Sequence, residues 1–244
     1  MARPVPEAEG DATPPASRVR VRTGTAIGLT GLVGGMLFAL LILASASVYE
    51  AVAADDGVAG LDRPVLDAMI RLRTPLSETV VTAFTQLGTT VPMVVIGLVL
   101  MGALYLTYRR RTIIVLMLVA AAGSITFTIV GKAWVGRSRP PLVDAVPPFE
   151  ESFSFPSGHT LNSTVVAGML AYLVVWLADR AWQRVCAVLG AVLWALAMGL
   201  SRVFLGHHWL TDVVFAWLFG LAWLALLITV HRIFLDRHAR RLTG

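Results

Sequence analysis

The sequence predicts an all-α, polytopic membrane protein with six transmembrane helices in one bundle and a short interfacial amphipathic helix. Hydrophobic residues make up 57% of the 244 residues and charged residues only 14%, compared with about 25% charged in an average globular chain. The mean hydropathy is +0.75. The apolar residues also form long blocks of about the 20 residues that a helix needs to cross a bilayer. This composition excludes a cytosolic enzyme, a disordered protein and a nucleic-acid-binding module, so we expect no nucleic-acid partner.

Six segments are long and apolar enough to span a membrane: 25–48, 79–107, 112–131, 159–178, 185–203 and 211–231. The second is long, and its first part, 79–88, is a candidate for an interfacial turn. Residues 62–73 alternate apolar and charged residues at helical spacing, which predicts a short amphipathic helix on the membrane surface.

The domain organisation follows from these spans. We expect a disordered cytoplasmic tail at 1–24, a single six-span domain at 25–231 and a basic cytoplasmic tail at 232–244. The first span is preceded by arginines and followed by Ala44-Ser45-Ala46, as in a cleaved secretory signal. Because the preceding tail and the apolar run are both longer than in such signals, an uncleaved anchor is the preferred interpretation.

The arginines predict the orientation in the membrane. Four basic clusters, at 18–22, 109–111, 180–184 and 237–241, fall on one side of a six-span layout. The positive-inside rule makes that side the cytoplasm, so we expect a bacterial plasma membrane protein with both termini cytoplasmic. Four cations lie on the opposite, extracytoplasmic side, where ionisable groups at span ends are functional candidates: Lys132, Arg137, Arg139 and Arg202.

Three polar clusters are predicted to meet at that outer face. They are the segments 132–140, 155–159 and 201–212, which leave or enter four different spans. Lys132, Arg139 and Arg202 supply a clamp for a phosphate, whose transfer is catalysed mostly by positioning and charge neutralisation. Ser157 and Gly158 begin a helix, whose free N–H groups form a natural phosphate cradle.

Two histidines and a carboxylate complete the predicted site. His208 and Asp212 are four residues apart on one face of a helix, so the carboxylate can hold one ring N–H while the other nitrogen attacks phosphorus. His159 is then placed to protonate the leaving alcohol and to activate water. The sequence has no paired-Asp or HExxH pattern, so we expect no metal and no cofactor.

These residues resemble a known signature. KxxxxxxRP at 132–140, PSGH at 156–159 and SRxxxxxHxxxD at 201–212 are similar to the three motifs of the type 2 phosphatidic acid phosphatase family, the lipid phosphate phosphatases, which share a scaffold with vanadium haloperoxidases. The resemblance implies a nucleophilic His208 with Asp212 as its partner and His159 as the acid. It also implies a phosphate-binding set, namely Lys132, Arg139, Ser157, Gly158 and Arg202.

Several residues near the motifs have simpler interpretations. For Arg137, a secondary phosphate contact and a solvent-facing position are equally open, and His207 is expected to be a bystander. For Asn162, a helix-to-helix hydrogen bond is preferred over a position lining the pocket. Glu150 belongs to an acidic loop expected to be solvated, and the single cysteine, Cys186, is expected to be a small buried hydrophobic residue.

The sequence thus predicts a metal-independent membrane phosphatase with a phosphohistidine intermediate and its active site on the extracytoplasmic face. The expected substrate is a lipid phosphate from the bilayer, either a phosphatidic-acid-type ester or an isoprenyl diphosphate of the undecaprenyl type. Two alternatives remain open. One is a lipid phosphotransferase that uses the same phosphohistidine, and the other is a non-catalytic scaffold or transporter.

Overall fold

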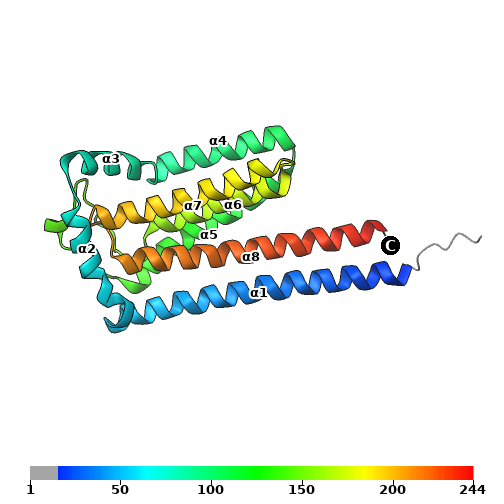
Figure 1. Ribbon diagram of the computed structural model, residues 1–244, viewed down its shortest axis with the longest axis horizontal. Helices are drawn as coiled ribbons and strands as arrows, with labels where there is room; N and C mark the ends of the chain where they lie inside the picture. Colours follow the sequence, from blue (N-terminus) through cyan, green and yellow to red (C-terminus); the bar gives the residue numbers. More distant parts are fainter. Residues whose placement is uncertain (1–15, 244) are drawn as a thin grey trace, which may run out of the picture.

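The computed structural model describes residues 16–243, with side chains described between 28 and 239, and every regular element there is helical. The α-helices are α1 (Ala16–Ala54), α2 (Asp62–Arg71), α3 (Pro75–Gln86), α4 (Thr90–Tyr108), α5 (Arg111–Val135), α6 (Gly158–Leu177), α7 (Ala181–Phe204) and α8 (Leu210–Thr243). Two short 3-10 helices, η1 (Gly57–Leu61) and η2 (Leu142–Asp144), lie in the links. Figure 1 shows the long helices running roughly parallel, with α2 and α3 at one end.

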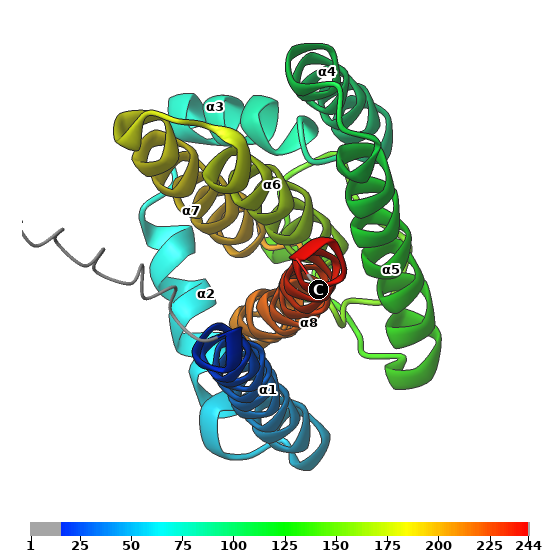
Figure 2. The same ribbon diagram turned by 90° about the vertical axis from the view of Figure 1, so that its right-hand side faces the viewer.

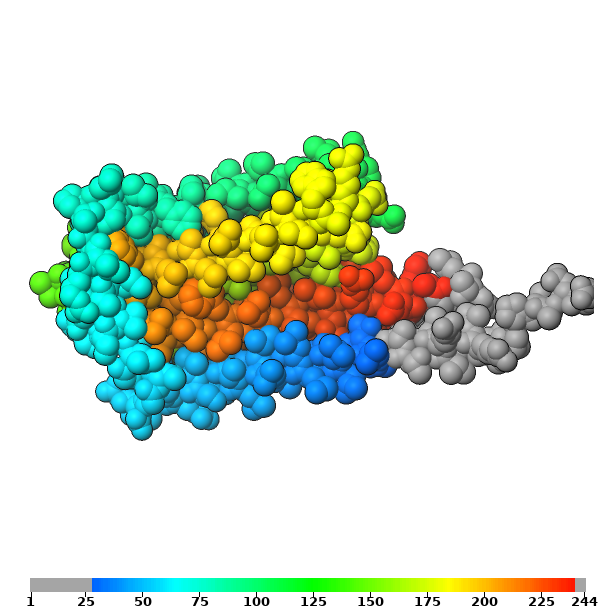
Figure 3. All heavy atoms as spheres, in the orientation of Figure 1, coloured from blue at the N-terminus to red at the C-terminus, as the bar shows by residue number. Residues whose placement is uncertain are grey.

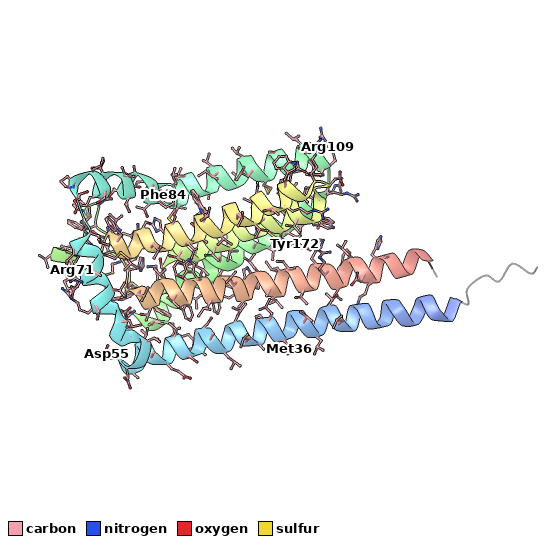
Figure 4. The ribbon with its side chains drawn as sticks, viewed as in Figure 1. Met36, Asp55, Arg71, Phe84, Arg109 and Tyr172 are labelled. Carbon is pink, nitrogen blue, oxygen red and sulfur yellow. The ribbon has the colours of Figure 1, made fainter. Side chains whose placement is uncertain are left out.

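Six helices in this part of the chain are long and apolar enough to cross a membrane: α1 from Gly28, α4, α5, α6, α7, and α8 as far as Ala239. The predicted all-α class and the six spans are therefore confirmed. The basic link at Arg109 lies at the end of the bundle opposite Asp55 and Arg71 (Figure 4).

The predicted second span, 79–107, is wrong in its first part, where a separate helix and not an interfacial turn is found. Thr74 caps the N-terminus of α3 reciprocally with Ser77. The Thr74 hydroxyl accepts from the N–H of Ser77, and the Ser77 hydroxyl accepts from the N–H of Thr74. Pro75, which favours a first helical position, follows. The chain then turns at Gly88, and α4 alone forms the span.

The predicted amphipathic helix is confirmed as α2, which begins at Asp62 and ends at Arg71. It lies across one end of the bundle beside α3, and together they cover that end (Figure 3). The helix is not fully exposed, because Leu66 and Asp62 are buried beneath it. This places α2 directly over the ends of α7 and α8, which it contacts.

The core lies where α6 contacts α5, α7 and α8, with α1 packed alongside α8 at the edge (Figure 2). Leu161, Val165 and Met169 on α6 are fully buried there. Close packing depends on small residues: a Cβ at Gly199 of α7 would lie 2.4 Å from Trp217 of α8. Cys186 on α7 is exposed, so its predicted burial is wrong.

The predicted tails overlap the first and last helices. α1 begins at Ala16, within the segment 1–24, and α8 continues to Thr243, through most of the segment 232–244. Residues 1–15 and 244 lie outside the described part of the chain.

Candidate active site

The three predicted clusters meet at the end of the bundle that α2 covers. Arg139, which follows α5, lies with Nη1 3.2 Å from Nε2 of His208, in the turn between α7 and α8. The N–H of Ser157, at the start of α6, donates to the carbonyl of Asp212 at 3.4 Å. Lys132, Gly158, His159 and His208 all line one cavity. Segments up to 80 residues apart in the sequence therefore form a single site.

His208 is held by the carboxylate of Asp212. Its Nδ1 lies 3.3 Å from Oδ2 of Asp212, and both side chains are buried. The same oxygen accepts from the N–H of Trp209 at 3.0 Å and from the Ser154 hydroxyl, which fixes the carboxylate. Burial lowers the pKa of His208 well below its usual value, and the cations Arg139, Arg202 and Lys132 lower it further. A neutral imidazole with its proton on Nδ1 leaves the Nε2 lone pair facing Arg139.

The turn that carries His208 has an unusual backbone. Gly206 has a φ of +71°, and a Cβ there would lie 2.3 Å from the carbonyl oxygen of Asp144. Only glycine accepts both this left-handed conformation and this close approach. The N–H groups of His207 and His208 both donate to the carbonyl of Arg202, at 2.9 and 3.2 Å. The histidine is thus tied to the last turn of α7.

His207 contacts the loop and not the cavity. Its Nε2 lies 2.7 Å from the carbonyl oxygen of Val146, its Nδ1 is buried without a partner, and it is absent from the cavity lining. Burial, with a smaller contribution from Arg202, lowers the pKa of His207 to about 4. Its position agrees with the expected bystander.

The lowered pKa of His207 predicts a loss of stability in mild acid. Because the pKa of His207 is about 4 in the folded state and 6.5 in the unfolded state, His207 binds a proton in the unfolded chain at pH values where it stays neutral in the folded protein. The stabilisation that neutral His207 gives the folded state is complete above pH 6.5 and is lost as the pH falls towards 4. We expect the thermal midpoint in detergent to fall less between pH 7 and 5 in His207→Gln than in the parent. An equal fall of the thermal midpoint in both proteins would contradict this prediction. His208, whose pKa is also lowered, contributes a pH dependence of the same sign to both proteins.

Glu150 lies inside the site, so its predicted solvated position is wrong. Its Oε2 accepts from Arg139 at 2.8 Å, its Oε1 pairs with Arg202, and it lines the cavity with His159. Burial acts to raise the pKa of Glu150, but Arg202 and Arg139 together lower it to about 2. The carboxylate therefore occupies the two guanidinium groups that the sequence assigns to phosphate. No periodicity marks a loop residue of this kind, so the sequence carried no signal for it.

Arg137 is not solvent-facing, because its side chain is only 16% exposed, and it does not line the cavity. Its Nη1 donates to Oδ1 of Asp212 at 2.6 Å, and its Nη2 donates to Oδ2 of Asp62 at 2.7 Å. The two arginines have different partners in the His208–Asp212 pair: Arg139 contacts the histidine, and Arg137 contacts the carboxylate.

The start of α6 supplies His159 and its neighbours. Nε2 of His159 is buried without a partner, and Nδ1 lies 4.0 Å from Oε1 of Glu150. A Cβ at Gly88 would lie 2.8 Å from the ring, so the turn before α4 packs against it. Ser157 is fully buried and its hydroxyl pairs with Thr160 at 2.9 Å. Its side chain does not line the cavity, whereas the backbone of Gly158 does.

Lys132 closes the site from the last turn of α5. Its Nζ donates to the Ser152 hydroxyl at 3.2 Å and to the carbonyl of Phe153. Arg139 donates to the Ser152 carbonyl at 2.6 Å. The loop between α5 and α6 is thus held at Ser152 and Phe153 by Lys132 of α5 and at Ser152 by its own Arg139.

The cavity itself has a volume of about 530 Å³ and lies between α4, α5 and α6. Its polar end holds Lys132, Glu150, His159 and His208, and its walls are apolar as far as Met101 on α4. From Thr90 to Met101 a helix rises about 16 Å. Asn162 lines this space with a buried Oδ1 that has no partner, so the alternative position is correct and the preferred helix-to-helix hydrogen bond is wrong.

Comparisons with known proteins agree with this architecture. The profile described as PAP2 superfamily matches residues 111–236. Phosphatidylglycerophosphatase B of Bacillus subtilis is 31% identical over 191 residues, which cover 76% of this chain and 88% of that protein. Undecaprenyl-diphosphatase of Sulfolobus acidocaldarius is 31% identical over 51% of this chain and 58% of that protein.

Two solved structures share the fold. The transmembrane PAP2 type phosphatidylglycerolphosphate phosphatase from Bacillus subtilis superposes with a TM-score of 0.70 at 26% identity, over 82% of this chain and 96% of that chain. LpxE of Aquifex aeolicus gives a TM-score of 0.51 at 21% identity, over 70% and 95%. With its six spans and its matched residues, this multi-pass membrane protein belongs to the PAP2 superfamily.

Proposed function

We propose that this protein hydrolyses phosphate esters or diphosphates of membrane lipids through a phosphohistidine on His208. The observation that carries the proposal is the shape of the cavity, whose apolar walls end at His208, His159, Lys132 and Glu150. A lipid tail can remain beside α4 and α5 while its phosphate reaches the polar end. The names of the relatives, a phosphatidylglycerophosphatase and an undecaprenyl-diphosphatase, support the same substrate class.

Each residue has a proposed role in two displacements. Nε2 of His208 attacks phosphorus while Nδ1–H is held by Asp212, and the bond from phosphorus to the leaving oxygen breaks. His159 gives a proton to that oxygen, and the lipid alcohol, or the lipid monophosphate from a diphosphate, leaves. His159 then takes a proton from water, which attacks the phosphohistidine and releases phosphate and free His208.

The charge on the transferring phosphoryl group is balanced by cations already in place. Arg139 and Arg202 supply two planar guanidinium groups, and Lys132 supplies a third positive charge. The N–H group of Gly158, at the N-terminus of α6, completes the binding set, whereas the N–H of Ser157 already donates to the carbonyl of Asp212. Substrate must displace Glu150 from Arg139 and Arg202, which the carboxylate holds before phosphate arrives.

The proposed setting is a bacterial plasma membrane, with the site on the extracytoplasmic face and both termini in the cytoplasm. The arginine-rich links at Arg109–Arg111 and at Arg180 support this orientation, because they lie at the end of the bundle away from the site. The covering helix α2 then lies at the outer membrane surface.

A substrate panel tests the proposal. The detergent-solubilised protein is offered phosphatidic acid, phosphatidylglycerophosphate and an undecaprenyl diphosphate, each with and without EDTA, and free phosphate is measured. Release from at least one lipid, with EDTA causing no loss, is the expected result. Label from the lipid appearing on a second alcohol without free phosphate would instead identify a phosphotransferase. No turnover of any lipid would favour a scaffold or transporter.

A further inference from the structure

One cation of the site, Arg137, lies between two carboxylates and does not line the cavity. It bonds to Asp212 at 2.6 Å on one side and to Asp62 at 2.7 Å on the other. The side chains of Arg137, Asp212 and Asp62 are only 16%, 0% and 6% exposed. Asp62 is the first residue of α2, so this triad links the covering helix to the His208–Asp212 pair.

Asp62 is fixed to the same turn of α8 that carries Asp212. Its Oδ1 accepts from the N–H of Thr211 at 2.8 Å, and its Oδ2 accepts from the Thr211 hydroxyl at 2.7 Å. Arg137 is held from a further side by the ring of Trp209, 5.7 Å from the guanidinium carbon. Each member of the triad therefore has its position set by several contacts.

The charges of the triad determine how much negative charge lies beside the His208 imidazole. In the proposed reaction the imidazole becomes positive when it takes the phosphoryl group, and Asp212 balances that charge. A single cation bonded to Asp212 would cancel it in a buried site, where interactions between charges are strong. With Asp62 present, two carboxylates surround one guanidinium, and one negative charge remains for His208.

We propose that Asp62 is a positioning residue for catalysis: by holding and neutralising Arg137, it leaves Asp212 as an effective anionic partner of His208. This inference rests on the proposed function, because it assigns Asp62 a role in that same reaction. Asp62 does not line the cavity. It acts through two other side chains and touches no substrate.

Asp62→Asn is the first test, since it removes the charge and keeps an oxygen to accept from Thr211. We expect kcat to fall about 10- to 100-fold, the usual range for loss of an outer-shell partner. KM is expected to stay within about threefold, because the phosphate-binding groups are untouched. The matched control is Asp67→Asn on the same helix, whose carboxylate pairs with Arg63 at 2.8 Å and is 37% exposed. That variant should keep the parent's kcat.

Two further measurements separate positioning from folding. In an Arg137→Gln background, Asp62→Asn is expected to change kcat less than about twofold, because the residue through which it acts is gone. Asp62→Glu and Asp62→Gln are matched in size and differ in charge, so the Glu variant is expected to be at least about fivefold faster. The Glu and Gln side chains have equal size, so this comparison tests the charge even if the Asn variant fails to fold.

Three outcomes would overturn the role of Asp62: a kcat for Asp62→Asn within twofold of the parent, equal rates for the Glu and Gln variants, or the full loss persisting without Arg137. If the parent turns over lipid phosphate and His208→Ala does not, these outcomes contradict Asp62 alone. If the parent turns over no lipid phosphate, the proposed function is contradicted and the role of Asp62 with it.

Discussion

Replacing His208 with alanine is expected to reduce lipid phosphate turnover by at least about a thousandfold, as removal of a covalent nucleophile does in other hydrolases. The imidazole is 1% exposed, and its ring nitrogens face Asp212 and Arg139. His207 contacts the carbonyl of Val146 and does not line the cavity, and His159, which does line it, has the separate proposed role of proton donor. Initial rates of phosphate release from the best lipid of the panel measure the effect.

The covalent step has its own signature. Rapid quenching of the parent with phosphate-labelled lipid should trap label on the protein in a form that acid releases and base preserves, as expected for a phosphohistidine. His208→Ala should trap none. His238→Ala is the matched control, because His238 is exposed near the end of α8, where it stacks on Phe234. Activity of His208→Ala within tenfold of the parent would exclude this residue as the nucleophile.

The bundle could be predicted because its signal is local. A span of about 20 apolar residues is sufficient to identify a membrane helix, and five of the six predicted spans correspond to single helices. The second predicted span joins the end of α3 to α4, and its first part, the candidate interfacial turn, is helical up to Gln86. The turn at Gly88 packs tightly against the bundle, since any side chain there would collide with Met198 and His159. Such a constraint is invisible in composition.

The site was predictable only where its residues keep a fixed spacing. His208 and Asp212 share a helical face, and the arginines follow motif positions, so their convergence could be expected from the six-span layout. Glu150 and Asp62 come from a loop and from the covering helix, and their partners lie 11 to 149 residues away in the sequence. Nothing in their local sequence distinguishes them from solvated carboxylates. Only the packing of α2 and the 142–154 loop over the bundle brings them to Arg137, Arg139 and Arg202.

Arg202→Ala is expected to lower kcat/KM by at least about a hundredfold, comparable to the loss of a transition-state donor in other enzymes. Arg202 is 1% exposed in the last turn of α7, where Nη1 donates to the Thr85 hydroxyl at 2.9 Å and Nη2 pairs with Glu150. Its removal takes away a planar pair of donors for phosphate oxygens and leaves Glu150 with one cation fewer. Repulsion between that carboxylate and the incoming phosphate then increases, so KM should rise as kcat falls.

Arg202→Lys separates charge from geometry at the same position. A lysine restores the positive charge but cannot bond to Thr85 and a phosphate oxygen from one rigid plane. We therefore expect Lys to recover part of the loss in KM, where neutralising Glu150 matters, and little of the loss in kcat, where orientation of the phosphoryl group matters. Arg63→Ala is the control. Arg63 lies on α2 at the same end of the bundle, is 53% exposed and pairs with Asp67 and Asp144. A lysine variant as fast as the parent would show that Arg202 supplies charge alone, and it would remove the geometric part of the proposed clamp.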